Sequence, residues 1–268
     1  MLDWYVHLSP PIWALIATTF TWCVTLLGAS LVFFFKTVNK SILDAMLGFA
    51  AGVMVAASFF SLLSPSIAMA ESLSMVAWMV ASTGFLCGGL LLFFGDKLIN
   101  HLDARFSRDQ NRASSRKRCM MLFSSITLHN IPEGMAVGVA FGSLAYHLEG
   151  ATFSAACMLA LGIGIQNFPE GSAVSIALRR EGISRRRAFF WGQLSGIVEP
   201  IAGVIGALLV LYVRTLLPFL LAFAAGAMIY VVVQELIPES QTNPQKNIMA
   251  LFTLIGFAVM MILDVALG

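Results

Sequence analysis

The chain has 268 residues, of which 59% are hydrophobic and 11% are charged, and its formal net charge is +2. Soluble domains carry about 25% charged and about 45–50% apolar residues. A water-soluble globular protein is therefore excluded, because one core of this size could not bury so much apolar surface. Lipid must be the solvent along much of the chain, and we expect a single transmembrane domain over residues 1–268.

Eight apolar stretches follow one another along the chain, each close to the length of about 20 residues that a membrane-spanning helix needs. The runs are long and unbroken, whereas strands of a membrane barrel are shorter and alternate, so they predict helices. The sequence thus predicts an all-α membrane protein with eight transmembrane helices. In chain order they are Ile12–Phe35, Ile42–Leu63, Leu73–Leu98, Cys119–Leu144, Ala151–Leu178, Ala188–Val213, Leu216–Ile237 and Ile248–Leu267.

The basic residues predict how these helices are oriented, because cytoplasmic loops are enriched in lysine and arginine. With the N-terminus outside, 15 of the 16 basic residues fall at cytoplasmic ends and loops, and only Arg214 lies outside. Both termini are then extracytoplasmic, and the basic loop 100–118 is inside. That loop is interpreted as a topology signal, with contact to anionic lipid as the alternative. We expect a plasma membrane, which in a bacterium is the inner membrane.

The first three and the last three predicted helices resemble each other. The matching pairs are Phe49–Met54 with Phe223–Met228, Leu27–Val32 with Ile205–Val210, and Gly84-Phe85 with Gly256-Phe257. Copies offset by five helices, an odd number, must insert upside down relative to each other. Inverted repeats around a midplane site are typical of secondary transporters. The predicted arrangement is therefore 3+2+3, with two helices between the copies.

The two middle helices carry closely similar motifs. Residues 129–137 read His-Asn-Ile-Pro-Glu-Gly-Met-Ala-Val, and residues 166–174 read Gln-Asn-Phe-Pro-Glu-Gly-Ser-Ala-Val. Each proline removes a backbone donor and loosens the preceding turn. The glycines Gly134 and Gly171 permit close approach of backbones at the kinks. Two bent helices lining a polar pocket are the expected result.

Three glutamates, Glu133, Glu170 and Glu199, lie within apolar spans. A charged residue at the centre of a membrane helix costs about 2.5–3.5 kcal/mol on insertion scales, so three that face one another call for a cation. His129 stands at i−4 from Glu133 and shares its helix face. The other candidate ligands are Asn130, Gln166 and Asn167. Mixed nitrogen and oxygen donors suit Zn²⁺, and also Fe²⁺, Mn²⁺ or Cd²⁺.

Together with Gly192–Pro200 (Gly-Gln-Leu-Ser-Gly-Ile-Val-Glu-Pro), the two Asn-x-Pro-Glu-Gly motifs and the eight spans resemble the ZIP (Zrt-, Irt-like protein) family of divalent metal transporters, in particular its GufA-like branch. The resemblance covers nearly the whole chain. It implies that ions move into the cytoplasm through a site on the fourth, fifth and sixth helices, and that the protein is a homodimer. By position, His129, Glu133, Gln166 and Glu170 match one metal position, and Asn130, Glu133, Asn167, Glu170 and Glu199 match a second.

Two residues depart from the family pattern. Many members have histidine where Gln166 stands, and some relatives with two metals have aspartate where Asn167 stands. The site then carries three formal negative charges, fewer than the four positive charges of two divalent ions. We therefore expect one tightly held ion at a time.

Other polar residues are candidates for the ion pathway. The resemblance implies an extracellular entrance at Asp264, and Gln234, Glu235 and Glu239 lie at the inner end of the seventh helix, where an exit is expected. Met54 is a candidate gate above the site, with core packing as the alternative.

The function predicted from these observations is secondary transport of a divalent transition metal, zinc first, by alternating access in the lipid bilayer. No GxxxxGK[ST] motif is found that would indicate nucleotide-driven transport, and no nucleic-acid partner is expected. An intramembrane metalloenzyme is one alternative, but HExxH spacing is absent, so we expect no enzyme. A proton-coupled organic-solute carrier is the other, although no cationic or aromatic group that would hold its solute is obvious at the midplane.

Overall fold

The computed structural model describes residues 8–35, 39–106, 113–146 and 151–267, and every regular element within these ranges is helical. Lys36 and residues 107–112, which belong to the predicted cytoplasmic ends and basic loop, lie outside the described residues. The helices are α1 (Pro10–Ala29), α2 (Leu31–Phe34), α3 (Lys40–Ala57), α4 (Ser64–Ser72), α5 (Ala77–Phe106), α6 (Ala113–Ser143), α7 (Phe153–Arg180), α8 (Arg185–Leu194), α9 (Val198–Tyr212), α10 (Leu217–Val231), α11 (Ile237–Ser240) and α12 (Lys246–Leu267).

Several of the predicted spans are helical runs with a local break. A π-helical segment, Ser58–Leu63, joins α3 to α4, and another, Val232–Leu236, joins α10 to α11. A 3₁₀ turn, Ser195–Ile197, joins α8 to α9 just before Glu199. π-helical turns inside α-helices often occur at functional sites.

Within the described residues, six helical runs are long and apolar enough to cross a membrane. They are Pro10–Phe34, Lys40–Ser72, Ala77–Leu98, Arg185–Tyr212, Arg214–Ser240 and Lys246–Leu267. The prediction of an all-α, multi-pass membrane protein is confirmed. The helices α6 and α7 are not among the six; they carry the two polar motifs, which lower their hydropathy.

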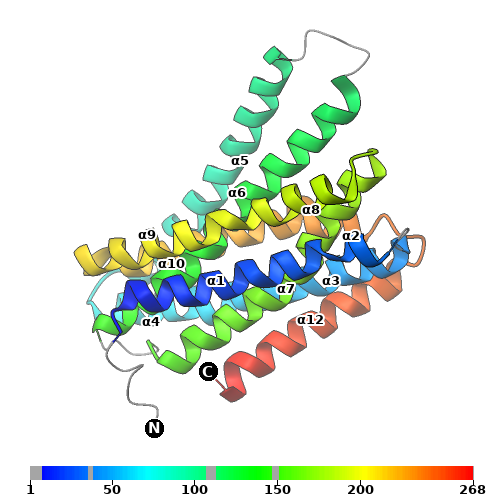
Figure 1. The fold of residues 1–268 in the computed structure, drawn as a ribbon. Coiled ribbons are helices and arrows are strands. Elements are labelled where there is room, and N and C mark those ends of the chain that lie inside the picture. Colours follow the sequence, from blue (N-terminus) through cyan, green and yellow to red (C-terminus); the bar gives the residue numbers. More distant parts are fainter. Residues whose placement is uncertain (1–7, 36–38, 107–112, 147–150, 268) are drawn as a thin grey trace.

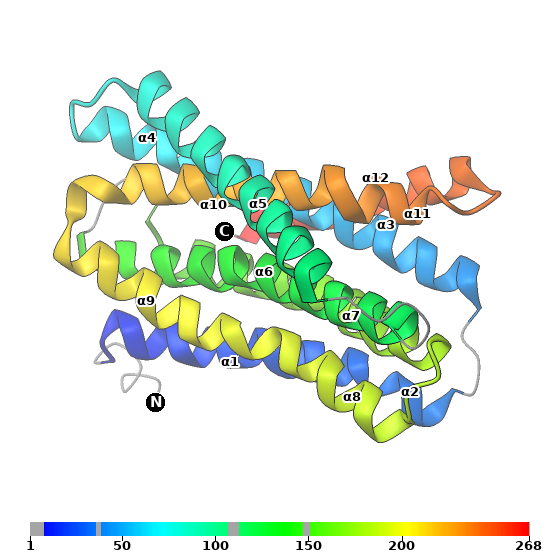
Figure 2. The ribbon, with the colours of Figure 1, turned by 90° about the horizontal axis from the view of Figure 1, so that it is seen from above.

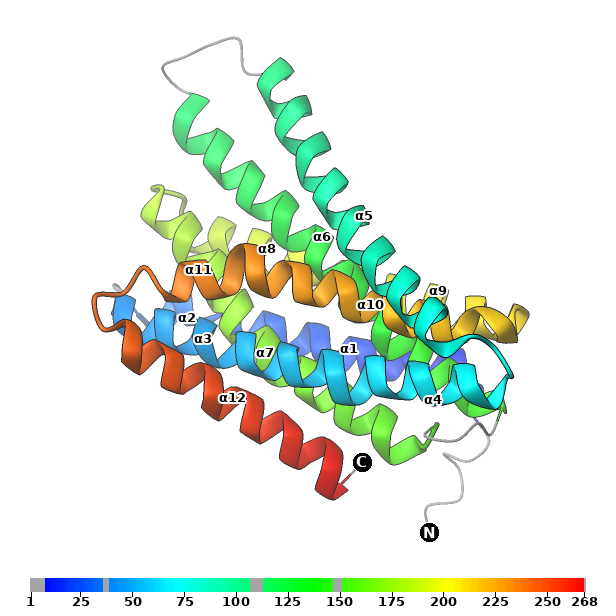
Figure 3. The same ribbon diagram turned by 180° about the vertical axis from the view of Figure 1, so that it is seen from behind.

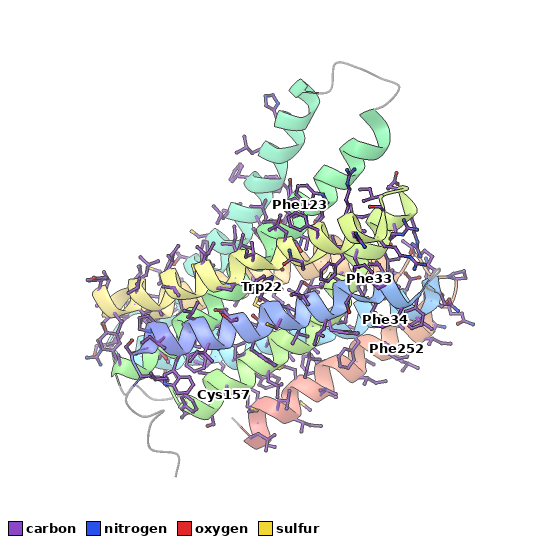
Figure 4. All side chains as sticks on the ribbon, in the orientation of Figure 1. Trp22, Phe33, Phe34, Phe123, Cys157 and Phe252 are labelled. Carbon is purple, nitrogen blue, oxygen red and sulfur yellow. The ribbon has the colours of Figure 1, made fainter. Side chains whose placement is uncertain are left out.

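The outer surface of the bundle is apolar, as lipid requires. Phe33, Phe34 and Phe252 project from it (Figure 4), and 76% of Phe34 is exposed. A soluble monomer rarely leaves so much large apolar surface in water.

The helices α6 and α7 run through the middle of the bundle (Figure 2), while the outer part of α6 extends away from it beside α5 (Figure 1). On one side α1 packs against α7 and α9, and α6 packs against α9. On the other side α3 packs against α7 and α12, and α10 packs against α6 and α5. The polar side chains of both motifs are therefore enclosed by other helices, while Ile131 of the first motif is exposed.

Glycines bring α3 close to α12 and α10 close to α5. A Cβ atom at Gly52 of α3 would lie 2.7 Å from the backbone nitrogen of Phe257 in α12, and one at Gly226 of α10 would lie 2.6 Å from the carbonyl carbon of Phe85 in α5. Small residues permit such close helix contacts in membranes. Gly52 and Gly226 occupy matching places in the two Phe-Ala-Ala-Gly stretches, and both helices continue into a π-helical segment. The α3–α12 pair is visible in Figure 3.

Candidate metal centre

Three glutamates from three helices meet inside the bundle. Glu133 lies in α6, Glu170 in α7 and Glu199 in the first turn of α9, and their exposed fractions are 0%, 8% and 0%. Glu133 interacts electrostatically with both of the other carboxylates, and Glu170 also interacts with Glu199. Because like charges in a buried site repel each other, this arrangement favours a bound cation.

Side-chain amides donate hydrogen bonds to two of these carboxylates. Gln166 Nε2 donates to Glu133 Oε1 at 2.7 Å, and Asn167 Nδ2 donates to both carboxylate oxygens of Glu199 at 2.9 Å each. The amide oxygens of Gln166 and Asn167 are thereby left as acceptors. Asn130 Nδ2 donates instead to the carbonyl of Ser195 at 2.8 Å, which ties α6 to the turn before α9.

Six of the seven predicted ligands each keep one buried polar atom that has no hydrogen-bond partner among the described residues. An unsatisfied buried polar atom costs about 1–3 kcal/mol, so the five oxygens among them require an explanation, while His129 Nε2 has an ion-pair contact with Glu235. Oxygen and imidazole nitrogen are both atom types that ligate divalent metals. The donor set therefore fits a divalent cation. The six atoms are His129 Nε2, Asn130 Oδ1, Glu133 Oε2, Gln166 Oε1, Asn167 Oδ1 and Glu170 Oε1.

His129 belongs to a second polar cluster beside the first. Its Nε2 atom lies 3.3 Å from Glu235 Oε1, and one ligand atom each from His129, Glu235 and Asp96 lie within 4.8 Å of one another. The hydroxyl of Tyr230 donates to Asp96 Oδ2 at 3.1 Å. Glu235 also interacts electrostatically with Glu170, so the two clusters adjoin.

The motif glycines lie where the helices of the centre touch. A Cβ atom at Gly134 of α6 would lie 2.6 Å from the Cα atom of Glu199, and one at Gly171 of α7 would lie 3.0 Å from the carbonyl carbon of Thr25. The close approach that the sequence predicted at both glycines is confirmed. Each glycine thus lets a motif helix contact a neighbour: α6 contacts α9, and α7 contacts α1.

The remaining pathway candidates differ in their surroundings. Asp264 Oδ1 accepts a hydrogen bond of 2.9 Å from Ser61, and both residues line a pocket of about 170 Å³. Met54 is fully buried in α3. Gln234 and Glu239 are exposed, and neither belongs to the described cluster of His129, Asp96 and Glu235.

Sequence reasoning missed two polar residues of the site. Asp96 lies near the end of the predicted span Leu73–Leu98, where an acidic residue within an apolar stretch was an available signal. Thr21 of α1 donates a hydrogen bond to Glu199 Oε2. Threonine is common in membrane helices, so a threonine within an apolar span does not indicate a functional site in the way that an acidic residue does.

These features define the class of protein. An all-helical, multi-pass membrane protein with a buried carboxylate cluster inside its bundle has the features of a protein that moves cations across a membrane. The family model described as ZIP Zinc transporter matches residues 8–119 and 105–264. The chain therefore belongs to the ZIP family.

Named relatives agree with this assignment. Zinc transporter ZIP11 of Homo sapiens is 39% identical, and the match covers 95% of this chain and 97% of the relative. Zinc transporter GufA of Myxococcus xanthus is 39% identical over 70% of this chain and 71% of its own length. Zinc transporter ZIPB of Bordetella bronchiseptica is 35% identical over 91% of this chain and 78% of its own length. The resemblance to the family and to its GufA-like members is confirmed, and the family is one of transporters rather than enzymes.

Proposed function

We propose that this chain carries Zn²⁺ across the membrane into the cytoplasm through the carboxylate cluster on α6, α7 and α9. The observation that carries the proposal is the set of five buried oxygen atoms without a hydrogen-bond partner on Asn130, Glu133, Gln166, Asn167 and Glu170, with the imidazole of His129 beside them. Zinc is favoured because the relatives are named zinc transporters. The same donors suit Cd²⁺, Fe²⁺ and Mn²⁺, which are the competing substrates to test.

The proposed route passes through three polar sites: a pocket, the glutamate cluster and the second polar cluster. The ion enters at the pocket of Ser61 and Asp264, sheds water, and binds among the buried glutamates. It leaves past Glu235 and Asp96, which adjoin the centre. This order is supported by the predicted orientation, because Asp264 lies towards the extracytoplasmic end of α12 and Asp96 towards the cytoplasmic end of α5.

The proposed architecture is the 3+2+3 inverted repeat in eight transmembrane helices, with both termini outside the plasma membrane and two chains in a homodimer. The repeat is supported by the matching glycine contacts of α3 and α10 and by the π-helical segment that follows each of them. Alternating access follows from such a repeat when one group of helices moves against the other around the site. The mobile group is proposed to be α1 with α6 to α9, and the scaffold α3 with α5, α10 and α12.

Zinc uptake by proteoliposomes that contain the purified protein tests the proposal. We expect uptake above that of protein-free vesicles and competition by excess Cd²⁺, and an imposed pH gradient reports any coupling to protons. Failure to take up any divalent metal would contradict the proposal. Uptake of an organic solute, or hydrolysis of a substrate, would then favour the carrier or the metalloenzyme.

We also predict that the centre holds one tight zinc ion per chain. Three carboxylates supply three formal negative charges, and both Asn167 and Gln166 are neutral, so a second dication would leave the buried site with net positive charge. Isothermal titration of the purified, metal-free protein with zinc measures the stoichiometry. Two equally tight ions per chain would contradict the single-ion arrangement.

A further inference from the structure

A row of threonines on α1 faces the interior of the bundle. Thr18, Thr21 and Thr25 are all buried, with exposed fractions of 0%, 0% and 2%. The Thr18 hydroxyl bonds only to carbonyls of its own helix, at 2.6 Å from Ala14 and 3.4 Å from Leu15. The Thr21 hydroxyl instead donates to a residue of another helix, Glu199 Oε2 in α9. Two similar buried hydroxyls, one turn apart, therefore have different partners.

Thr21 is one of the donors around the carboxylate of Glu199, together with Asn167 and the Thr25 hydroxyl of the same helix. Asn167 Nδ2 of α7 donates to both oxygens of Glu199, and the Thr21 hydroxyl of α1 donates to Oε2. Thr21 Oγ1 also lies 2.9 Å from the carbonyl oxygen of Thr18. A hydroxyl has one proton to donate, so Thr21 can turn that proton either to Glu199 or to its own helix. Rotation of this hydroxyl can therefore make or break the hydrogen bond to Glu199 while the backbone of α1 stays in place.

The neighbouring contacts fix α1 at this place. Trp22 Nε1 donates to the carbonyl of Gln193 at 2.9 Å, which ties α1 to α8 (Trp22 is labelled in Figure 4). A Cβ atom at Gly28 would lie 2.9 Å from the carbonyl carbon of Phe168, so α1 also lies directly against the second motif. These contacts place Thr21 beside the centre.

The internal repeat gives Thr21 a counterpart. When Leu27–Val32 is aligned with Ile205–Val210, Thr21 precedes the first stretch by six residues and Glu199 precedes the second by six. The two residues that share the hydrogen bond are therefore equivalent positions of the two copies. A pseudo-two-fold axis between inverted copies brings equivalent positions face to face at the midplane.

We propose that Thr21 is a positioning residue of the metal centre, which holds the carboxylate of Glu199 in the orientation that ligates the transported cation. The inference rests on the proposed function of the glutamate cluster. Hydrogen-bond partners of metal ligands orient them, and their loss typically costs 10–100-fold in metal affinity or activity. α1 then supplies a functional side chain to a site otherwise built from α6, α7 and α9.

The test compares three variants in the purified protein. Thr21→Val keeps the shape of the side chain and removes the hydroxyl, Thr21→Ser keeps the hydroxyl, and Thr18→Val removes a buried hydroxyl that bonds only within α1. We expect Thr21→Val to weaken zinc binding in isothermal titration by about 10–100-fold and to raise the KM of uptake more than it lowers the maximal rate. Thr21→Ser and Thr18→Val are expected to bind zinc as the wild-type chain does.

Two results would overturn the inference. One is wild-type zinc affinity in Thr21→Val; the other is an equal loss in Thr18→Val, which would assign the effect to packing of α1. Should Thr21→Val not purify as a monodisperse protein, Thr21→Ala carries the same comparison. A wild-type chain that binds no zinc would instead refute the proposed function, so the two failures are distinguishable.

Discussion

Replacing Glu133 or Glu170 by alanine is expected to reduce zinc uptake to that of protein-free vesicles. Loss of an outer-shell partner already costs about 10–100-fold, and these residues are proposed as direct ligands at the centre of the cluster. The variants should still insert, because removing a carboxylate makes a membrane helix more apolar. Uptake by proteoliposomes with equal amounts of protein measures the effect.

Replacing Glu133 by glutamine predicts a change of stability that depends on metal. Without metal, Glu133→Gln should raise the thermal unfolding temperature in detergent, because it relieves repulsion between buried carboxylates. With zinc at about 100 times its Kd, the wild-type chain should gain about 2.7 kcal/mol of stability, and the variant should gain much less. A higher unfolding temperature without metal together with a smaller gain from zinc distinguishes a ligand from a residue that only packs.

Glu71 provides the matched control, because it is an exposed glutamate of α4, outside the glutamate cluster. Glu71→Gln should leave both uptake and the zinc-dependent stabilisation unchanged. Undiminished uptake in both Glu133→Ala and Glu170→Ala would refute the assignment of the site.

Gly134→Ala is the second substitution with a large expected effect. The added Cβ would lie 2.6 Å from the Cα atom of Glu199, so α6 and α9 must move apart. Overpacking of this kind costs about 1–3 kcal/mol, and a displacement of about 1 Å at a functional site can cost about 100-fold in rate. We expect a lower unfolding temperature and a loss of zinc uptake of that order.

A glycine of another helix controls for the change from glycine to alanine. A Cβ atom at Gly89 of α5 would lie 3.6 Å from the nearest atom, the carbonyl oxygen of Gly226, which is an ordinary contact. Gly89→Ala should therefore transport zinc at the wild-type rate. Equal uptake by Gly134→Ala and wild-type protein would contradict the close contact of α6 with α9.

The sequence predicted the helices and most of the centre because the relevant signals are local. A span of about 20 apolar residues identifies a membrane helix, and a carboxylate within it is costly enough to stand out, as at Glu133. The motif glycines Gly134 and Gly171 likewise predicted the close helix contacts that the structure contains. Each of these features can be read within one helix.

Other features depend on which helices become neighbours, which no local pattern specifies. The hydroxyl of Thr21 reaches Glu199 only because α1 packs against α7 and α9. His129 shares a helix face with Glu133, yet it also reaches Glu235 of the π-helical segment after α10. The break between α8 and α9 similarly depends on tertiary contacts, because Asn130 of α6 bonds the carbonyl of Ser195 in that turn.

Diffraction from crystals soaked in zinc, recorded on both sides of the zinc absorption edge, tests the central claim most directly. We predict one strong anomalous peak within bonding distance of Glu133, Glu170 and Glu199, at about 2.0–2.2 Å from ligating carboxylate oxygens. A map with no anomalous peak among these three carboxylates, in crystals where zinc binds elsewhere on the chain, would contradict the account.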